Sequence, residues 1–183
     1  MNKILKLTIV LFLVCAIAAG ILGGVNELTY QRIADQAAAK TREAFASVMI
    51  ADEFPELPVD HAAFPTVDRV NQALKGGSIA GYVVTSTFSG AQGNITLAVG
   101  VSPDYKCTGI SVIEHSETSG LGANAASTGE VGVKFRAQFV GQDEQIALAN
   151  AGGSIDALTG ATITSRAITG AVAESIRVVK SLG

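Results

Sequence analysis

A short segment ending at Thr162 has the residue types and the position of a phosphate attachment site. It reads Asp156-Ala157-Leu158-Thr159-Gly160-Ala161-Thr162 and stands directly before a helical pattern at the C-terminus. The first amides of a helix lack an intrahelical acceptor and the helix dipole is positive there, so a phosphate on a hydroxyl at this point lies in a favourable field. The alternative is ordinary turn chemistry, because threonine and glycine often precede a capped helix.

A second segment combines glycines with polar and apolar side chains. It reads His115-Ser116-Glu117-Thr118-Ser119-Gly120-Leu121-Gly122 and follows a predicted strand. The two glycines allow the backbone to approach a bound group closely, and Leu121 between them offers an apolar contact. The Thr118 hydroxyl and the loop amides are possible hydrogen-bond donors. Alternatives stay open for two residues: His115 as a surface histidine at a strand end, and Glu117 as a ligand of backbone amides.

These segments must be positioned by a C-terminal helix and an antiparallel sheet. Thr164 or Ser165 is expected to cap the helix, and apolar residues recur on one of its faces at spacings of four, four and three: Ile168, Val172, Ile176 and Val179. Strands joined by turns are predicted at Ile79–Phe88, Ile95–Val101 and Cys107–Glu114. The expected fold class is α+β, a small domain with an antiparallel meander and packed helices.

The chain before the sheet is expected to hold a membrane anchor. No charged residue occurs from Leu7 to Asn26, and a helix of this length spans about 30 Å, the thickness of a bilayer core. Lys3 and Lys6 precede this stretch, so the positive-inside rule keeps the N-terminus in the cytoplasm and exports the rest of the chain across a bacterial or archaeal cell membrane. A cleavable signal peptide is the alternative, because Ala16-Ile17-Ala18 resembles a small-residue cleavage site.

Beyond the anchor, two further regions are expected. A helix over Glu27–Ile50 and a proline-containing loop over Ala51–Asp68 form a stalk. The predicted regions are therefore residues 1–26 as cytoplasmic N-terminus and anchor, 27–68 as stalk and loop, and 69–183 as the soluble domain.

Composition argues against several classes of protein. A net charge of -3 and a pI near 5.3 leave no basic surface for nucleic acid. Of the two cysteines, Cys15 lies in the apolar leader and Cys107 in a predicted strand, so neither a disulfide framework nor a metal site is indicated. No arrangement for nucleophilic catalysis is evident.

Both segments resemble the FMN-binding domain family. In its flavinylation motif an aspartate is followed three residues later by threonine or serine and then by Gly-Ala-Thr, and a similar run at 168–172 lacks both the aspartate and the acceptor threonine. The second segment resembles the family's His-x-Glu-Thr-Pro-Gly-Leu-Gly loop, which approaches the flavin; Ser119 replaces the usual proline and loosens the loop. The glycine turn Ser89–Gly93 also resembles the family, so the resemblance extends over about Ile79 to Lys180.

The resemblance implies FMN bound covalently through its phosphate to the Thr162 hydroxyl by a flavin transferase. It implies no catalytic side chain and no metal. The implied cofactor-binding residues are Asp156, Thr159, Gly160, Ala161 and Thr162 in the first segment and Glu117, Thr118, Gly120, Leu121 and Gly122 in the second.

Within the family, the short chain, single anchor and C-terminal flavin site are most similar to the G subunits of Rnf complexes. This likeness implies an electron-transfer subunit of a ferredoxin:NAD oxidoreductase that translocates Na+ or H+, acting as an enzyme only within that complex. Its partners would be the other membrane subunits and the flavin transferase. The C subunit of the Na+-translocating NADH:quinone reductase shares both motifs but is usually longer. A membrane-anchored structural or binding domain without a cofactor is the alternative from another class.

Overall fold

The first part of the chain is one long helix. In the computed structural model, which describes residues 3–182, the chain divides into two units between Lys40 and Thr41. The first unit is formed by α1 (Lys3–Val48), which continues into the second unit. By length and composition alone, α1 is the helix among the described residues that is able to cross a membrane. The helix predicted over Glu27–Ile50 is confirmed as far as Val48.

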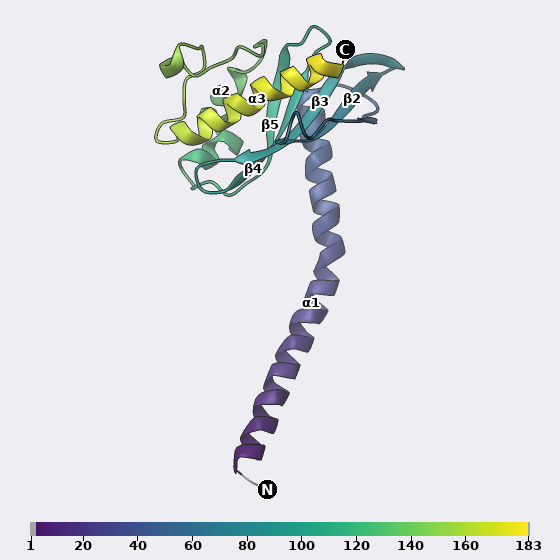
Figure 1. Cartoon of the computed structure of the whole chain (residues 1–183), viewed down its shortest axis with the longest axis vertical. Helices are drawn as coiled ribbons and strands as arrows, with labels where there is room; N and C mark the ends of the chain where they lie inside the picture. The colour runs from purple at the N-terminus through teal and green to yellow at the C-terminus, as the bar shows by residue number, and fades with distance from the viewer. Residues whose placement is uncertain (1–2, 183) are drawn as a thin grey trace. The chain divides into compact units, whose positions relative to one another are not determined.

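The second unit is built on an antiparallel sheet (Figure 1). The strands of the sheet follow one another in chain order. Its strands are β1 (Glu56–Leu57), β2 (Val67–Lys75), β3 (Ser78–Ser89), β4 (Asn94–Val101) and β5 (Cys107–His115). The predicted α+β class and antiparallel meander are confirmed. Edge strand β1 has only two residues and lies between Pro55 and Pro58.

Strand β2 was not predicted from the sequence. Its exposed Asp68, Arg69 and Lys75 hide the alternation of buried and exposed residues that marks a strand. Pairing with β3 stabilises this strand although its local pattern does not predict one, and Val70 is paired with Val84 of β3. The loop predicted over Ala51–Asp68 therefore contains β1 and ends as β2 begins.

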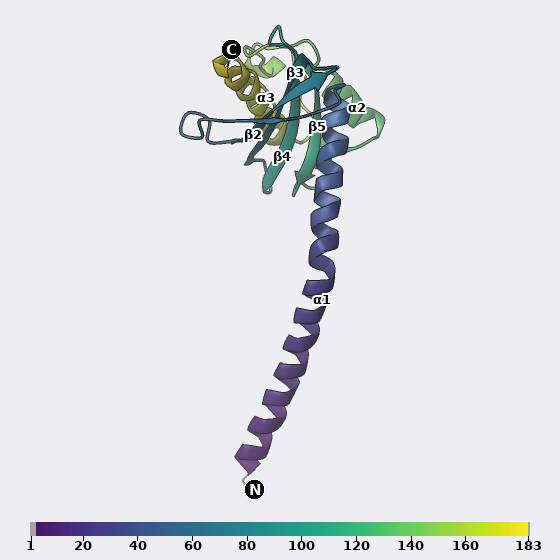
Figure 2. The same cartoon turned by 90° about the vertical axis from the view of Figure 1, so that its right-hand side faces the viewer.

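The two faces of the sheet bury different helices (Figure 2). Val84 and Leu97 pack in one cluster with α3 (Thr162–Leu182), whose predicted apolar stripe is buried throughout. Their neighbours Val83 and Ala98 point to the other face and pack against the last turns of α1, because successive residues of a strand alternate between faces. The sheet thus fixes α3, and with it the start of that helix.

The last turn of α1 is seated closely on β4 and β5. Thr108 Oγ1 donates a 2.6 Å hydrogen bond to the Val48 carbonyl oxygen. A Cβ added to Gly100 would lie 2.5 Å from that same oxygen. Only glycine leaves room for this contact.

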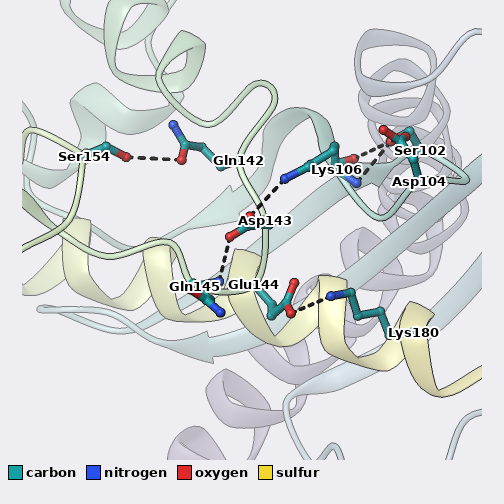
Figure 3. A network of polar contacts seen from close by, with 9 residues as sticks. All are labelled: Ser102, Asp104, Lys106, Gln142, Asp143, Glu144, Gln145, Ser154 and Lys180. Atoms are coloured by element: carbon teal, nitrogen blue, oxygen red, sulfur yellow. Dashed lines mark hydrogen bonds and ion pairs between the residues drawn. The ribbon is translucent and has the colours of Figure 1, made fainter.

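Ion pairs hold the C-terminal end of α3 (Figure 3). Lys180 Nζ lies 2.5 Å from Glu144 Oε1, and Lys106 Nζ lies 2.9 Å from Asp143 Oδ2. They tie the loop that holds Asp143 and Glu144 to α3 and to the β4–β5 turn, far from the start of α3. The elements between β5 and α3 are η1 (Gly122–Ala126), α2 (Glu130–Ala137) and η2 (Ala149–Ala151).

Candidate functional site

Helix α3 begins at Thr162, so the expectation that Thr164 or Ser165 caps it is wrong. The Ala161 carbonyl oxygen accepts the Ser165 N–H at 2.9 Å, which makes Ala161 the residue at the helix boundary. The hydroxyls of Thr164 and Ser165 are both inside the first turn and have other partners. Thr162 itself is exposed, at the end of the helix where backbone amides lack intrahelical acceptors.

The turn before α3 is tied to the helix by a serine. Ser165 Oγ accepts the Leu158 N–H at 3.0 Å and donates to the Ala161 carbonyl oxygen at 2.9 Å. Gly160 completes the turn with a φ of 71°, in the left-handed region. The motif residues Asp156, Thr159 and Gly160 are exposed and Ala161 is buried.

Folding brings the two predicted segments together. A Cβ added to Gly160 would lie 3.0 Å from Leu121 Cδ2, so Leu121 lies against the turn that leads to Thr162. The loop bends at Gly120, with a φ of 78°, and the Thr118 carbonyl oxygen accepts the N–H groups of Leu121 and Ala123 at 3.2 Å each. Segments about forty residues apart in sequence thus form one site.

Glu117 connects this site to a third segment, the β3–β4 turn. Its Oε1 accepts the N–H groups of Ala91 at 2.8 Å and Gln92 at 3.1 Å. Its Oε2 accepts the Thr164 hydroxyl at 2.5 Å. The side chain is 8% exposed, and a Cβ on Gly122 would overlap both Glu117 Oε2 and Thr164 Oγ1.

The hydrogen bonds hold Glu117 in its charged form. Burial by itself raises the pKa of this carboxyl, but the donors Thr164, Gln92 and Ala91 outweigh burial, and the pKa lies below its ordinary value. His115 Nδ1 accepts the Glu117 N–H at 3.2 Å. The imidazole therefore supports the loop backbone.

The surroundings of Thr162 fit a tethered flavin phosphate. Thr162 is exposed at a helix start, and two apolar residues are exposed near it, Leu121 by 43% and Ile163 by 63%. Thr164, by contrast, is 1% exposed and already bonded to Glu117. Only Thr162 of these two hydroxyls is open to a reagent from outside.

Two contributors to the site were not predicted from the sequence in these roles. Ser165 organises the turn before α3, and Gln138 binds the backbone of Asp156 on both sides: its Oε1 accepts the Asp156 N–H at 2.7 Å and its Nε2 donates to the Asp156 carbonyl oxygen at 3.3 Å. The role of Ser165 could have been predicted from local sequence, because this serine lies only four residues after the boundary residue Ala161. The role of Gln138 could not, because its partner Asp156 is distant in sequence.

Cys107 is a packed strand residue, as predicted. It is buried, and burial raises the pKa of its thiol to about 12. The thiol is therefore protonated at neutral pH and has no part in the site.

Comparison with known proteins identifies the family of this chain. The FMN-binding domain model matches residues 90–177, and the RnfG N-terminal region model matches residues 1–48. The chain is 32% identical to the G subunit of the ion-translocating oxidoreductase complex of Methanosarcina acetivorans, over 98% of this chain and 96% of the relative. It is 30% identical to the G subunit of the Na(+)-translocating ferredoxin:NAD(+) oxidoreductase complex of Acetobacterium woodii, over 98% and 93%.

A third relative is the G subunit of the ion-translocating oxidoreductase complex of Yersinia pestis, 32% identical over 95% of this chain and 89% of the relative. The matches cover both the long helix and the domain that holds the two segments. The chain therefore belongs to the G-subunit family of ion-translocating oxidoreductase complexes, and its FMN-binding domain includes Thr162.

Proposed function

We propose that this chain is the electron-transfer G subunit of an Rnf-type ferredoxin:NAD oxidoreductase and carries FMN as a phosphoester on Thr162. The observation that carries the proposal is the contact between Leu121 and Gly160, which joins the loop to the turn before an exposed threonine. The names of the M. acetivorans and A. woodii relatives support the assignment to a complex.

Attachment joins the Thr162 oxygen to the phosphorus of FMN. With flavin adenine dinucleotide as donor, the bond from Thr162 Oγ1 to phosphorus forms and the pyrophosphate bond breaks. AMP leaves, and the hydroxyl proton passes to a base of the flavin transferase. No electrons are exchanged with the protein in this step, and the threonine gains FMN less one water.

The residues around Thr162 bind and orient the cofactor. The amides at the start of α3 favour the phosphate, and Gly160 directs the chain into that helix. Leu121 offers the apolar contact, while Thr118 and the loop amides supply donors. We assign supporting roles to the remaining motif residues: Asp156, Thr159, Ala161, Glu117, Gly120 and Gly122. When bound, FMN supplies one- and two-electron transfer, and the protein sets its surroundings.

The chain works as part of a membrane assembly in this proposal. Residues 1–26 anchor it with the N-terminus in the cytoplasm, residues 27–68 form the stalk and loop, and residues 69–183 form the FMN-binding domain on the exported side. Electrons pass between this domain and the neighbouring subunits, coupled to translocation of Na+ or H+. The subunit has redox function only within that complex.

Peptide mass spectrometry tests the attachment directly. Full-length protein is coexpressed with a flavin transferase, and the peptide containing Asp156–Arg166 is analysed. We expect a gain of FMN less one water on Thr162, lost in Thr162→Ala. Thr128→Ala removes an exposed threonine outside both segments and should be loaded like the wild type. An unmodified wild-type peptide, or a flavin mapped to Thr164, would overturn the proposal.

A further inference from the structure

We propose that Glu117 is a positioning residue that holds the flavin on Thr162 beside Leu121 without touching the flavin itself. The inference rests on the proposed attachment at Thr162. It revises the role that resemblance implies for Glu117, from a cofactor ligand to a clamp between three segments of the protein.

Both carboxylate oxygens of Glu117 are occupied by protein donors. The amides of Ala91 and Gln92 bind one oxygen, and the Thr164 hydroxyl binds the other. An ionised carboxylate has no proton to donate. With its side chain 8% exposed, Glu117 offers neither a donor nor open surface to a ring.

Two glycine backbones approach the carboxylate closely. A Cβ on Gly90 would overlap Glu117 Oε1, and a Cβ on Gly122 would overlap Glu117 Oε2. Gly90 of the β3–β4 turn thus lies close to one oxygen, and Gly122 of the loop lies close to the other. The clamp joins that turn, the loop and the first turn of α3 into one unit.

The geometry of the helix separates the clamp from the attachment point. Successive residues of an α-helix are about 100° apart, so Thr162 and Thr164 point to roughly opposite sides of the same turn. Thr164 is buried and bonded to Glu117, while Thr162 faces solvent. Glu117 therefore binds the buried side of the first turn of α3, and the flavin is attached to the exposed side of the same turn.

Loss of the clamp should loosen the loop relative to α3 while leaving Thr162 accessible. Since a hydrogen bond to a charged group contributes more than a neutral one, its removal should shift the balance between closed and open loop about tenfold or more. The flavin would then stay attached but lose its fixed contact with Leu121.

The test compares variants of the full-length protein after coexpression with a flavin transferase. Thr164→Val removes the hydroxyl, Thr164→Ser restores it, and Glu117→Ala removes both acceptors. Thr169→Val is the matched control, because the Thr169 hydroxyl is also buried but bonds to the Ser165 carbonyl oxygen of its own helix. Each variant is measured for flavin mass, flavin fluorescence anisotropy, iodide quenching and urea unfolding.

We expect Thr164→Val and Glu117→Ala to carry flavin on Thr162 with lower anisotropy and stronger iodide quenching than the wild type. Thr164→Ser and Thr169→Val should match the wild type in both flavin signals, even where Thr169→Val lowers the urea midpoint. Wild-type signals in Thr164→Val and Glu117→Ala, or equal changes in Thr169→Val, would overturn the clamp alone. A wild type without flavin would instead defeat the proposed attachment.

Discussion

At the scale of single residues, burial decides which hydroxyl of α3 is available. Thr162 and Thr164 are two residues apart and chemically identical, yet one is exposed and the other is 1% exposed and bonded to a carboxylate. Their positions on opposite sides of one helical turn produce this difference. A helix capped by Thr164 or Ser165, as the sequence pattern predicts, would not have separated them in this way.

The charge of Glu117 should make stability depend on pH. Its pKa is lowered in the folded protein, so its contribution to stability is present above the ordinary glutamate pKa of about 4.3 and is lost as the pH falls through the lower folded value. Glu117→Gln should therefore lower the free energy of unfolding by about 1–3 kcal/mol at pH 7, with a smaller difference from the wild type in acid. Urea midpoints measured from neutral pH downward check this.

Glu114→Gln is the control for that measurement. Glu114 is on β5 near the same loop but is exposed, so its substitution should change the urea midpoint little at any pH. His115, the other titratable group that acts on Glu117, is present in every variant. An unchanged difference between wild type and Glu117→Gln in acid would contradict the lowered pKa.

Most residues of the site could be predicted from the sequence, but their partners could not. The two segments stand out through glycines and hydroxyls at characteristic positions. Their contact at Gly160 and Leu121 depends on how the sheet places β5 against α3. The bonds of Glu117 to Ala91, Gln92 and Thr164 cross between segments 25 to 47 residues apart. No local pattern specifies such pairs.

At the scale of elements, the packing of the last turn of α1 against the sheet depends on glycine at position 100. Gly100→Ala would place a Cβ against the Val48 carbonyl oxygen and Thr108 Oγ1. We expect a loss of about 1–3 kcal/mol, as for other overpacked sites. Urea unfolding of the detergent-solubilised full-length protein measures it.

Gly170→Ala provides the matched comparison within α3. Nothing lies within 4 Å of a Cβ at Gly170, so alanine should stabilise the helix by about 0.5–1 kcal/mol. If both alanine variants shifted the urea midpoint in the same direction, the close contact of α1 with Gly100 would not explain the effect of Gly100→Ala on the free energy of unfolding.

Elements with a continuous apolar pattern were predictable, and β2 was not. The apolar stripe of α3 and the apolar runs around Val83 and Val99 follow local patterns that the structure confirms. In β2 charged residues interrupt the apolar run, since Val70 and Asn71 are both buried and Asp68 and Arg69 are both exposed. Such a strand exists because its neighbours pair with it.

At the scale of the whole molecule, the proposed topology can be tested by thiol labelling. In a Cys15→Ala background, Thr128→Cys places a thiol on an exposed loop of the domain, and Lys6→Cys places one before the apolar stretch. Cys107 should add little background, because burial raises its pKa to about 12.

A membrane-impermeant maleimide should label Thr128→Cys in spheroplasts and Lys6→Cys only after permeabilisation. The expected labelling follows from the positive charge on the N-terminal side of the span, where Lys3 remains in Lys6→Cys. Labelling of Lys6→Cys in sealed spheroplasts would reverse the proposed orientation. Gel mobility of the labelled protein gives the readout.

The shortness of β1 restricts how other chains can associate with this sheet. An unpaired edge strand normally invites another chain to extend the sheet by backbone pairing, and proline and short length are common protections against it. Here the edge is two residues long between Pro55 and Pro58. A protein that docked on this side would have little backbone to pair with and would depend on side-chain contacts, and crowded copies have little template there for growing fibrils.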